Sequence, residues 1–271
     1  MYKLLLISDQ AEILDAFAQI DSWELLGFKP PHIRHDFEGA KESLQKHHAD
    51  GIAIALSPAE EEKVLQYLQE KYPLVSIFQA GRTPSEIIRY LTELKMLLNR
   101  VRADFSNDSY TEIDMLQLCR HEFLGKLMAG KILTRETLYR NMQLLRSRLD
   151  PDCPCVLMEL EQVAIRYDRL EGRWPSSKDR LEFTLRNSLG PDFRGLHIVP
   201  TVLPDGKILV LACPLKGQNP HMTTDDMIAV FTGHVADNIE HLKEYKGVDL
   251  HMVGIRVLPA LTALCEDTDE E

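Results

Sequence analysis

The chain has 271 residues, more than a single hydrophobic core usually serves, so we expect two domains. Lys and Arg total 31 against 42 Asp and Glu, and the net charge of −11 argues against broad, non-specific binding to nucleic acid or anionic lipid. Five scattered cysteines do not suggest a secreted disulfide scaffold. No apolar run reaches the roughly 18 residues that cross a bilayer, and no signal peptide is evident. We therefore expect a soluble, cytoplasmic protein without membrane contact.

Short apolar runs alternate with helical stretches from residue 2 to about residue 104. Such runs between polar residues are typical of buried strands, and Pro58 stands in a first-turn position, where its missing N–H costs a helix nothing. Alternating strands and helices predict a parallel sheet with helices on both faces. The expected strands are Leu4–Ile7, His32–Arg34, Ile52–Leu56 and Val75–Phe78, and the expected helices are Glu12–Ile20, Glu38–His47, Pro58–Tyr72 and a long one from Thr83.

The stretch from Glu86 to about Leu149 has an almost wholly helical pattern, interrupted near Phe105–Ser109 and at Gly130. Two apolar stripes run along it. Periodicity alone does not separate a helix that packs on its own domain from one that transmits a signal or pairs with a second copy, so both interpretations stay open. The stripes are Leu91, Leu94, Leu97, Leu98 and Val101, followed by Leu116, Phe123, Leu124, Leu127 and Met128.

The pattern changes again from about residue 153. Leu203-Pro204-Asp205-Gly206 is a turn sequence between two apolar runs and predicts a hairpin. Thr223 or Thr224 is the expected cap of a long helix. The order predicts an antiparallel or mixed sheet with helices on one face. The expected strands are Val156–Leu160, His197–Leu203, Lys207–Ala212 and Leu250–Val257, and the expected helices are Val163–Leu170, Ser177–Leu189 and Thr223–Glu244.

Three parts of the chain carry a resemblance to AraC-type response regulators. Tyr2–Gln10 and Ile20–Phe28 resemble the receiver domain of that family, and His121–Lys131 is similar to its helical connector. Tyr167–Trp174 and His251–Arg256 resemble its degenerate GGDEF-like domain. The resemblance implies an α/β chain with a shortened flavodoxin-like (receiver-type) parallel sheet, then helices, then an α+β nucleotide-cyclase-like domain. The implied boundaries are 1–104 for a pseudo-receiver, 105–150 for a helical linker, 151–265 for the GGDEF-like domain and 266–271 for an acidic tail.

The resemblance also locates a phosphorylation site that has lost its chemistry. In a receiver, carboxylates at the carboxyl edge of the sheet hold Mg²⁺ beside a phosphorylatable Asp. The acidic pair falls on Ser8 and Asp9, so one carboxylate is missing. The phosphate acceptor falls on Ala55, which has no oxygen to phosphorylate, and the phosphate-sensing hydroxyl falls on Ala80. We expect a degenerate phosphorylation site and no phosphorylation switch.

The expected GGDEF-like domain shows similar losses. A cyclase needs carboxylates to hold metal at the triphosphate and a Gly-rich hairpin that the nucleotide can approach. Glu159 and Glu161 retain acidity on the first strand, but they alternate along it and could simply face solvent. The hairpin Pro204–Lys207 lacks the paired glycines and the Asp-Glu of the motif. A residual metal or nucleotide site at Glu159 and Glu161 is therefore the less favoured interpretation.

These observations predict a non-catalytic, phosphorylation-independent regulatory protein that resembles a response regulator of transcription. It would act through protein contacts, as a homodimer or with a regulatory protein partner, without cofactor or metal. The alternative is a nucleotide-binding sensor or residual cyclase-like enzyme that uses Glu159 and Glu161. Asp9 and Asp50 are interpreted as surface or loop-capping carboxylates and Ser57 as a helix N-cap. Because no basic recognition helix is evident before Glu271, we expect no direct DNA binding by this chain.

Overall fold

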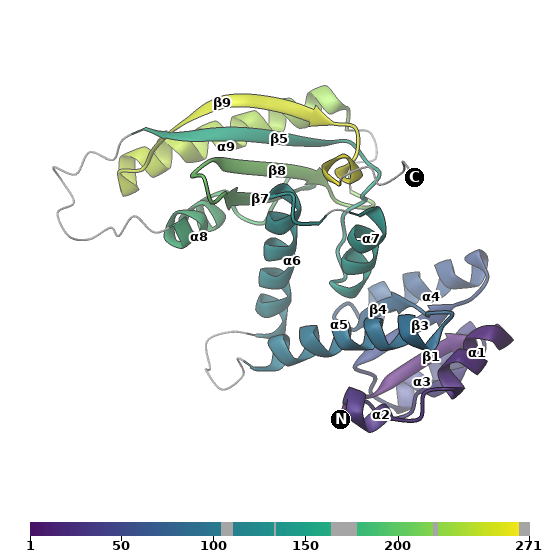
Figure 1. The fold of residues 1–271 in the computed structure, drawn as a ribbon. Coiled ribbons are helices and arrows are strands. Elements are labelled where there is room, and N and C mark those ends of the chain that lie inside the picture. The colour runs from purple at the N-terminus through teal and green to yellow at the C-terminus, as the bar shows by residue number, and fades with distance from the viewer. Residues whose placement is uncertain (104–110, 133, 164–177, 219–221, 266–271) are drawn as a thin grey trace, which may run out of the picture. The chain divides into compact units, whose positions relative to one another are not determined.

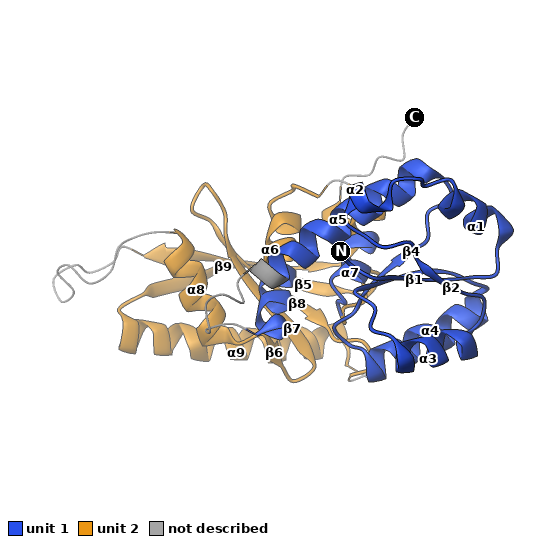
Figure 2. Ribbon diagram, turned by 90° about the horizontal axis from the view of Figure 1, so that it is seen from below, with its two compact units in different colours: residues 1–120, 139–147 blue, residues 121–138, 148–271 orange. Residues whose placement is uncertain are grey.

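The computed structural model describes residues 1–103, 111–132, 134–163, 178–218 and 222–265. The chain forms two compact units (Figure 2). Unit 1 contains residues 1–120 and 139–147, and unit 2 contains residues 121–138 and 148–271. The division therefore runs through two helices, α6 (Glu112–Met128) and α7 (Arg135–Leu144), both within the segment predicted as a helical linker.

Unit 1 is built on a four-stranded parallel sheet of order β2-β1-β3-β4 (Figure 1). The predicted α/β architecture with a parallel sheet is confirmed, and β4 lies one residue later than expected. The strands are β1 (Leu4–Ser8), β2 (His32–Arg34), β3 (Gly51–Ala55) and β4 (Ser76–Gln79), and the helices are α1 (Ala11–Ala18), α2 (Trp23–Leu26), α3 (Phe37–Lys46), α4 (Pro58–Lys71) and α5 (Pro84–Ala103).

Alternation along β1 divides its side chains between two cores. Leu4 and Leu6 join a core with residues of α1, α2 and α5. Leu5 and Ile7 join a second core with residues of α3 and α4. Since successive side chains of a strand point to opposite faces, the continuous apolar run of β1 supplies both cores. Helices cover both faces of the sheet, as the sequence predicted.

Helix α2 was not expected, because a single turn leaves no periodicity to recognise. Trp23 is buried and stacks on Phe17 with ring centroids 6.1 Å apart. Gly27 ends the turn with φ +86°, the left-handed conformation in which glycine is least strained. The turn thus adds one aromatic side chain to the core that contains Leu4 and Leu6.

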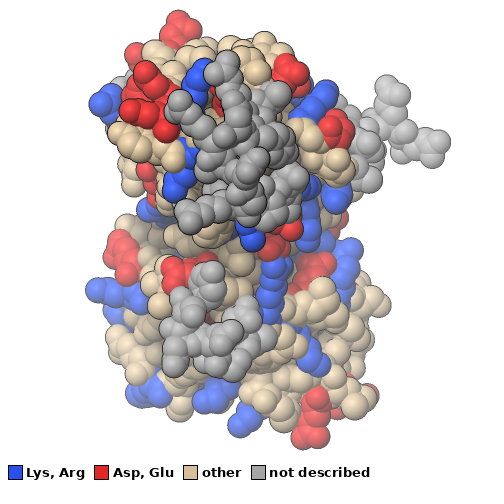
Figure 3. All heavy atoms as spheres, turned by 90° about the vertical axis from the view of Figure 1, so that its left-hand side faces the viewer, with Lys and Arg blue, Asp and Glu red and all other residues tan. Residues whose placement is uncertain are grey.

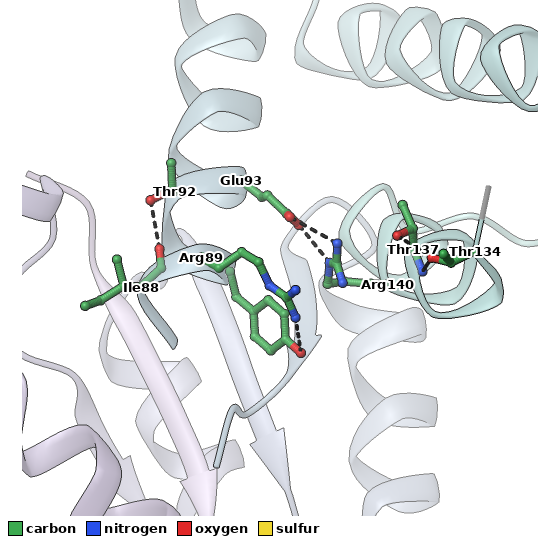
Figure 4. A network of polar contacts seen from close by, with 8 residues as sticks. Ile88, Arg89, Thr92, Glu93, Thr134, Thr137 and Arg140 are labelled. Carbon is green, nitrogen blue, oxygen red and sulfur yellow. Dashed lines mark hydrogen bonds and ion pairs between the residues drawn. The ribbon is translucent and has the colours of Figure 1, made fainter. Parts of the chain in front are cut away.

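The second half of α7 belongs to unit 1. Leu144 lies in the same core as β1 and α5. Arg140 forms a two-pronged ion pair with Glu93 of α5, at 2.8 Å from Nε and 3.1 Å from Nη2 (Figure 4). The Arg140 guanidinium also lies over the Tyr90 ring, 5.3 Å from its centroid. The break expected at Gly130 is present, with φ +66° after the end of α6, whereas the one expected at Phe105–Ser109 lies outside the described residues.

Unit 2 is built on a five-stranded antiparallel sheet of order β6-β7-β8-β5-β9. The predicted hairpin joins β7 to β8, with Gly206 at φ +89° in the turn. Thr223 caps α9 through a capping box with Asp226, as expected. The elements are β5 (Cys155–Val163), α8 (Lys178–Leu189), β6 (Asp192–Phe193), β7 (Leu196–Val202), β8 (Ile208–Pro214), α9 (Thr224–Lys246), β9 (Asp249–Leu258) and the short 3-10 helix η3 (Leu261–Leu264). Strand β6 was missed because two residues carry no pattern; the helix predicted over Val163–Leu170 falls almost entirely outside the described residues.

The sheet of unit 2 has helical residues against both faces, which corrects the expectation of helices on one face. Val156 and Met158 of β5 point into a core formed with α8 and α9. Leu157, between them, points to the other face and lines a hollow together with Met128 of α6. The end of α6 therefore packs against the second face of the sheet. This was not expected, because α6 was predicted to be part of a linker.

Candidate functional site

The predicted degenerate phosphorylation site lies at the carboxyl edge of the parallel sheet. Ser8 and Ala55 are register partners at the ends of β1 and β3. Ala80 follows β4, and its N–H donates to the Ile54 carbonyl at 2.8 Å. The fold therefore gathers these positions, as the sequence implied, whereas Asp9 is exposed.

Ser8, the last residue of β1, makes hydrogen bonds within unit 1. Its side chain is buried, and its Oγ accepts a hydrogen bond from the Gln10 N–H at 3.2 Å. Its carbonyl lies 2.9 Å from Nδ1 of His35. Ala55 and Ala80 are only 8% and 9% exposed, so methyl groups and backbone close this edge. The Ser8 hydroxyl and carbonyl are thus used for hydrogen bonds within unit 1, and Ala55 and Ala80 carry no oxygen in their side chains.

One carboxylate that the sequence analysis did not single out lies at this edge. Glu61, in the first turn of α4, accepts a hydrogen bond from the Gln79 side-chain amide at the end of β4. Partial burial raises the pKa of Glu61, and the bond from Gln79 opposes that rise. Within the described ranges, no group of three or more His, Cys, Asp or Glu side chains could hold a metal ion.

Asp50 and Ser57 have structural roles. Asp50 precedes β3, at the amino edge of the sheet, where it accepts the Lys3 N–H at 2.6 Å and contacts His48 Nε2 at 3.0 Å. This confirms a loop-capping carboxylate, although a buried one. Ser57 occupies the N-cap position of α4 as predicted, but its side chain makes no capping hydrogen bond; its backbone carbonyl accepts from the first turn.

Glu159 and Glu161 lie on the same face of β5, two residues apart. Glu159 borders a hollow of about 450 Å³ on the face that α6 approaches, and its Oε1 is 3.9 Å from Lys207 Nζ. Glu161 is exposed and pairs in register with His251 of β9. The neighbours of the two carboxylates are thus Lys207 and His251, whereas a divalent ion would need further oxygen ligands. Among the described residues, Glu159 and Glu161 therefore belong to no cluster that could bind a metal ion.

The hollow beside Glu159 is lined by both apolar and charged side chains. Leu157 and Leu209 are among the apolar ones, and Lys207 and Arg256 are the basic ones. Such a mixture suits a small amphipathic or anionic molecule better than a bare cation.

A polar cluster in unit 2 was not predicted from the sequence, although one of its members, His121, begins the stretch that resembles the connector. His121 of α6 is 8% exposed, and its Nε2 lies 3.4 Å from Glu182 Oε1 of α8 without hydrogen-bond geometry. The other oxygen of Glu182 accepts the Val202 N–H at 2.9 Å. The Thr201 hydroxyl contacts that same oxygen at 3.5 Å. A cluster that joins residues so far apart in sequence leaves no local motif.

The contacts of Glu182 determine its ionisation. Burial raises its pKa, but the contact with His121 and the Val202 N–H stabilise the carboxylate, so that the net effect lowers the pKa below its usual range. Gly125 brings α6 close to the same place, since a Cβ there would lie 2.6 Å from Thr201 Oγ1. The cluster anchors the second half of α6 to β7 and α8 within unit 2.

On the face drawn in Figure 3, Lys and Arg side chains are interspersed with Asp and Glu, without a broad patch of one sign among the described residues. Every helix in the described part of the chain is too short or too polar to span a membrane. No protein-family model matches the chain, and no curated protein matches it significantly.

Proposed function

We propose that this chain is a non-catalytic regulatory protein of the cytoplasm, resembling a response regulator whose receiver no longer takes phosphate. In this proposal residues 1–104 form a flavodoxin-like pseudo-receiver and residues 151–265 a degenerate GGDEF-like domain. The protein would act in signal transduction through protein contacts or dimerisation. The chain would bind neither DNA nor membrane directly.

One observation carries the proposal: the end of β3, where a receiver would place its acceptor, is Ala55 beside Ser8. Neither residue is a carboxylate, and Ser8 Oγ is already held by Gln10. Glu61 is bound to Gln79 through its side chain. A phosphoryl group would therefore meet no Asp acceptor at the end of β3, and among the described residues no cluster of three or more His, Cys, Asp or Glu side chains could hold a metal ion to neutralise its charge.

The test is phosphorylation of the intact chain by acetyl phosphate with Mg²⁺, followed by intact mass spectrometry. A receiver with a complete acidic site, run in parallel, confirms that the reagent is active. We expect no hydroxylamine-sensitive phosphoryl adduct on this chain. An adduct that hydroxylamine removes would be an acyl phosphate and would refute the proposal.

A second candidate function, a nucleotide-binding sensor or residual cyclase, is favoured by the hollow beside Glu159. In that case Lys207 and Arg256 would contact phosphate, and Glu159 and Glu161 would approach a metal. Calorimetry with GTP and Mg²⁺ tests it, with Lys207→Ala and Glu159→Gln as variants. Saturable binding that both variants weaken would support this candidate, and absence of binding to the wild-type chain would exclude it.

A further inference from the structure

The last strand of unit 2 forms an open edge of its sheet. β9 has 10 residues and pairs only with β5 in the sheet order. Every residue from His251 to Val257 is exposed. The other sheet edges are much shorter: β2 has 3 residues, β4 has 4 and β6 has 2. Among the described strands, β9 is therefore the long unpaired edge.

An edge strand carries a specific chemistry. Its outward N–H and C=O groups lack strand partners and fit the backbone of another extended chain at the spacing of a sheet. Natural sheets protect such edges with prolines, lysines, bulges or covering elements. β9 contains neither Pro nor Lys. It has one bulge, opposite Glu159 and Leu160, which protects the edge only locally.

The exposed side chains of β9 are largely apolar. Met252 is 43% exposed, Val253 57%, Ile255 44% and Val257 43%. Single exposed apolar residues are ordinary, but here four lie within six positions of one edge strand. A strand that paired with β9 would reduce the exposure of these side chains and satisfy the backbone groups of the edge.

We propose that β9 pairs antiparallel with β9 of a second copy of this chain, joining the two antiparallel sheets across a twofold axis. Charge complementarity favours a second copy as the partner. β9 carries Asp249 at its start and Arg256 near its end, so in an antiparallel pair each Asp249 can face the Arg256 of the other copy. Such a symmetric pair is isologous, which is the commonest arrangement of protein dimers.

The charges also define the register. When Asp249 opposes Arg256, Leu250 opposes Ile255 and His251 opposes Gly254. Asp249 already contacts Lys243 at 3.0 Å, so Arg256 of the second copy would add a second cation to that carboxylate. Gly254 leaves room opposite His251, because a Cβ at position 254 would meet nothing within 4 Å. No like charges face one another in this register, despite the net charge of −11 for the chain.

This inference extends the proposed function, because it names the partner of a protein that acts by contact. It depends on β9 and on none of the residues at the degenerate phosphorylation site. Phosphorylation of the chain would refute the proposed function and leave the dimer untouched, whereas a monomeric chain would refute the dimer alone.

Sedimentation velocity of the full chain over a concentration series tests the dimer. We expect reversible dimerisation that Ile255→Lys weakens by at least about tenfold, because a lysine on an edge strand opposes strand addition. Ile88→Lys is the matched control: Ile88, on α5, is 41% exposed, close to the 44% of Ile255. Circular dichroism should show both variants folded. A monomeric wild-type chain, or an Ile255→Lys variant that dimerises normally, would overturn the proposal.

Disulfide trapping tests the register. A mixture of His251→Cys and Gly254→Cys chains should form a mixed disulfide dimer on mild oxidation, since opposed positions of paired strands bring Cβ atoms into disulfide range. A mixture of His251→Cys and Ile88→Cys is the control and should form far less. If the first mixture gives no more crosslinked dimer than the second, the pairing is wrong.

Discussion

The two sheets differ in what surrounds their strands. In the parallel sheet of unit 1, β1 and β3 are buried along their whole length. In the antiparallel sheet of unit 2, β9 is exposed over most of its length. The first sheet uses its residues, including Ser8 and Ala55 at its carboxyl edge, for its own packing. The second retains an uncovered edge, which is why we place contact with a partner in unit 2.

The largest expected effect comes from substituting the same residue type in the two sheets. Ile54 of β3 is 1% exposed, whereas Ile255 of β9 is 44% exposed. Ile54→Ala should lower the free energy of unfolding by about 2–5 kcal/mol through lost burial and a residual cavity. Ile255→Ala, measured at concentrations too low for dimerisation, should change it by less than about 1 kcal/mol.

Tryptophan fluorescence can follow unit 1 alone. The chain has 2 tryptophans, so Trp174→Phe leaves Trp23, buried beside Phe17, as the single probe. Urea unfolding of Ile54→Ala in this background measures the loss in unit 1. Urea unfolding of Ile255→Ala, followed by circular dichroism, which reports on both units, gives the value for comparison. Equal losses for the two substitutions would show that the difference between the sheets has no energetic counterpart.

The sequence predicted the buried strands better than the exposed features. The apolar runs of β1 and β3 identify strands because both faces are buried. Leu250–Val257 was also predicted as a strand, but nothing in its pattern tells an edge from an interior position. α2 and β6 were missed because their few residues carry no periodicity.

Some residues of the candidate sites could likewise be predicted from the sequence, and others could not. Ala55 and Ala80 could be placed from the sequence, since Ala55 ends one recognisable strand and Ala80 follows another. Contacts between distant positions could not, because no local spacing encodes them: Glu61 with Gln79, and His121 with Glu182. The polar cluster that anchors α6 therefore emerged only from the fold.

The next prediction concerns the packing of α6 against β7, on the face of the unit 2 sheet opposite α8 and α9. Gly125→Ala should lower the free energy of unfolding by about 1–3 kcal/mol, because the added Cβ would lie 2.6 Å from Thr201 Oγ1. The loss should appear although alanine favours helix over glycine by about 1 kcal/mol. In the Gly125→Ala/Thr201→Ala double variant the clash is removed, so a double-mutant cycle should show favourable coupling. Additive losses would contradict a direct contact.

Glu182 should make the stability of unit 2 depend on pH. Its folded pKa lies below the ordinary value of 4.5, so its contribution is present above that pH and is lost as the pH falls through the folded pKa. Glu182→Gln should cost about 1–2 kcal/mol at neutral pH, as expected for a hydrogen-bonded carboxylate. The difference from wild type should shrink in acid. A difference that stays constant with pH would show that ionisation of Glu182 does not contribute.

The smallest effect is expected from substitutions at the N-caps of one helix in each unit. The Thr223 side chain accepts the Asp226 N–H in the capping box of α9, whereas the Ser57 side chain makes no capping bond at α4. Thr223→Ala should therefore lower the free energy of unfolding by about 1 kcal/mol. Thr223→Ser should lower it much less, because serine keeps the capping hydroxyl. Ser57→Ala should change it by less than about 0.5 kcal/mol. Thermal and urea unfolding of the three variants measure this directly. A loss at Ser57 as large as at Thr223 would mean that the carboxyl edge of the parallel sheet depends on that hydroxyl, and its assignment as an inert edge would have to be revised.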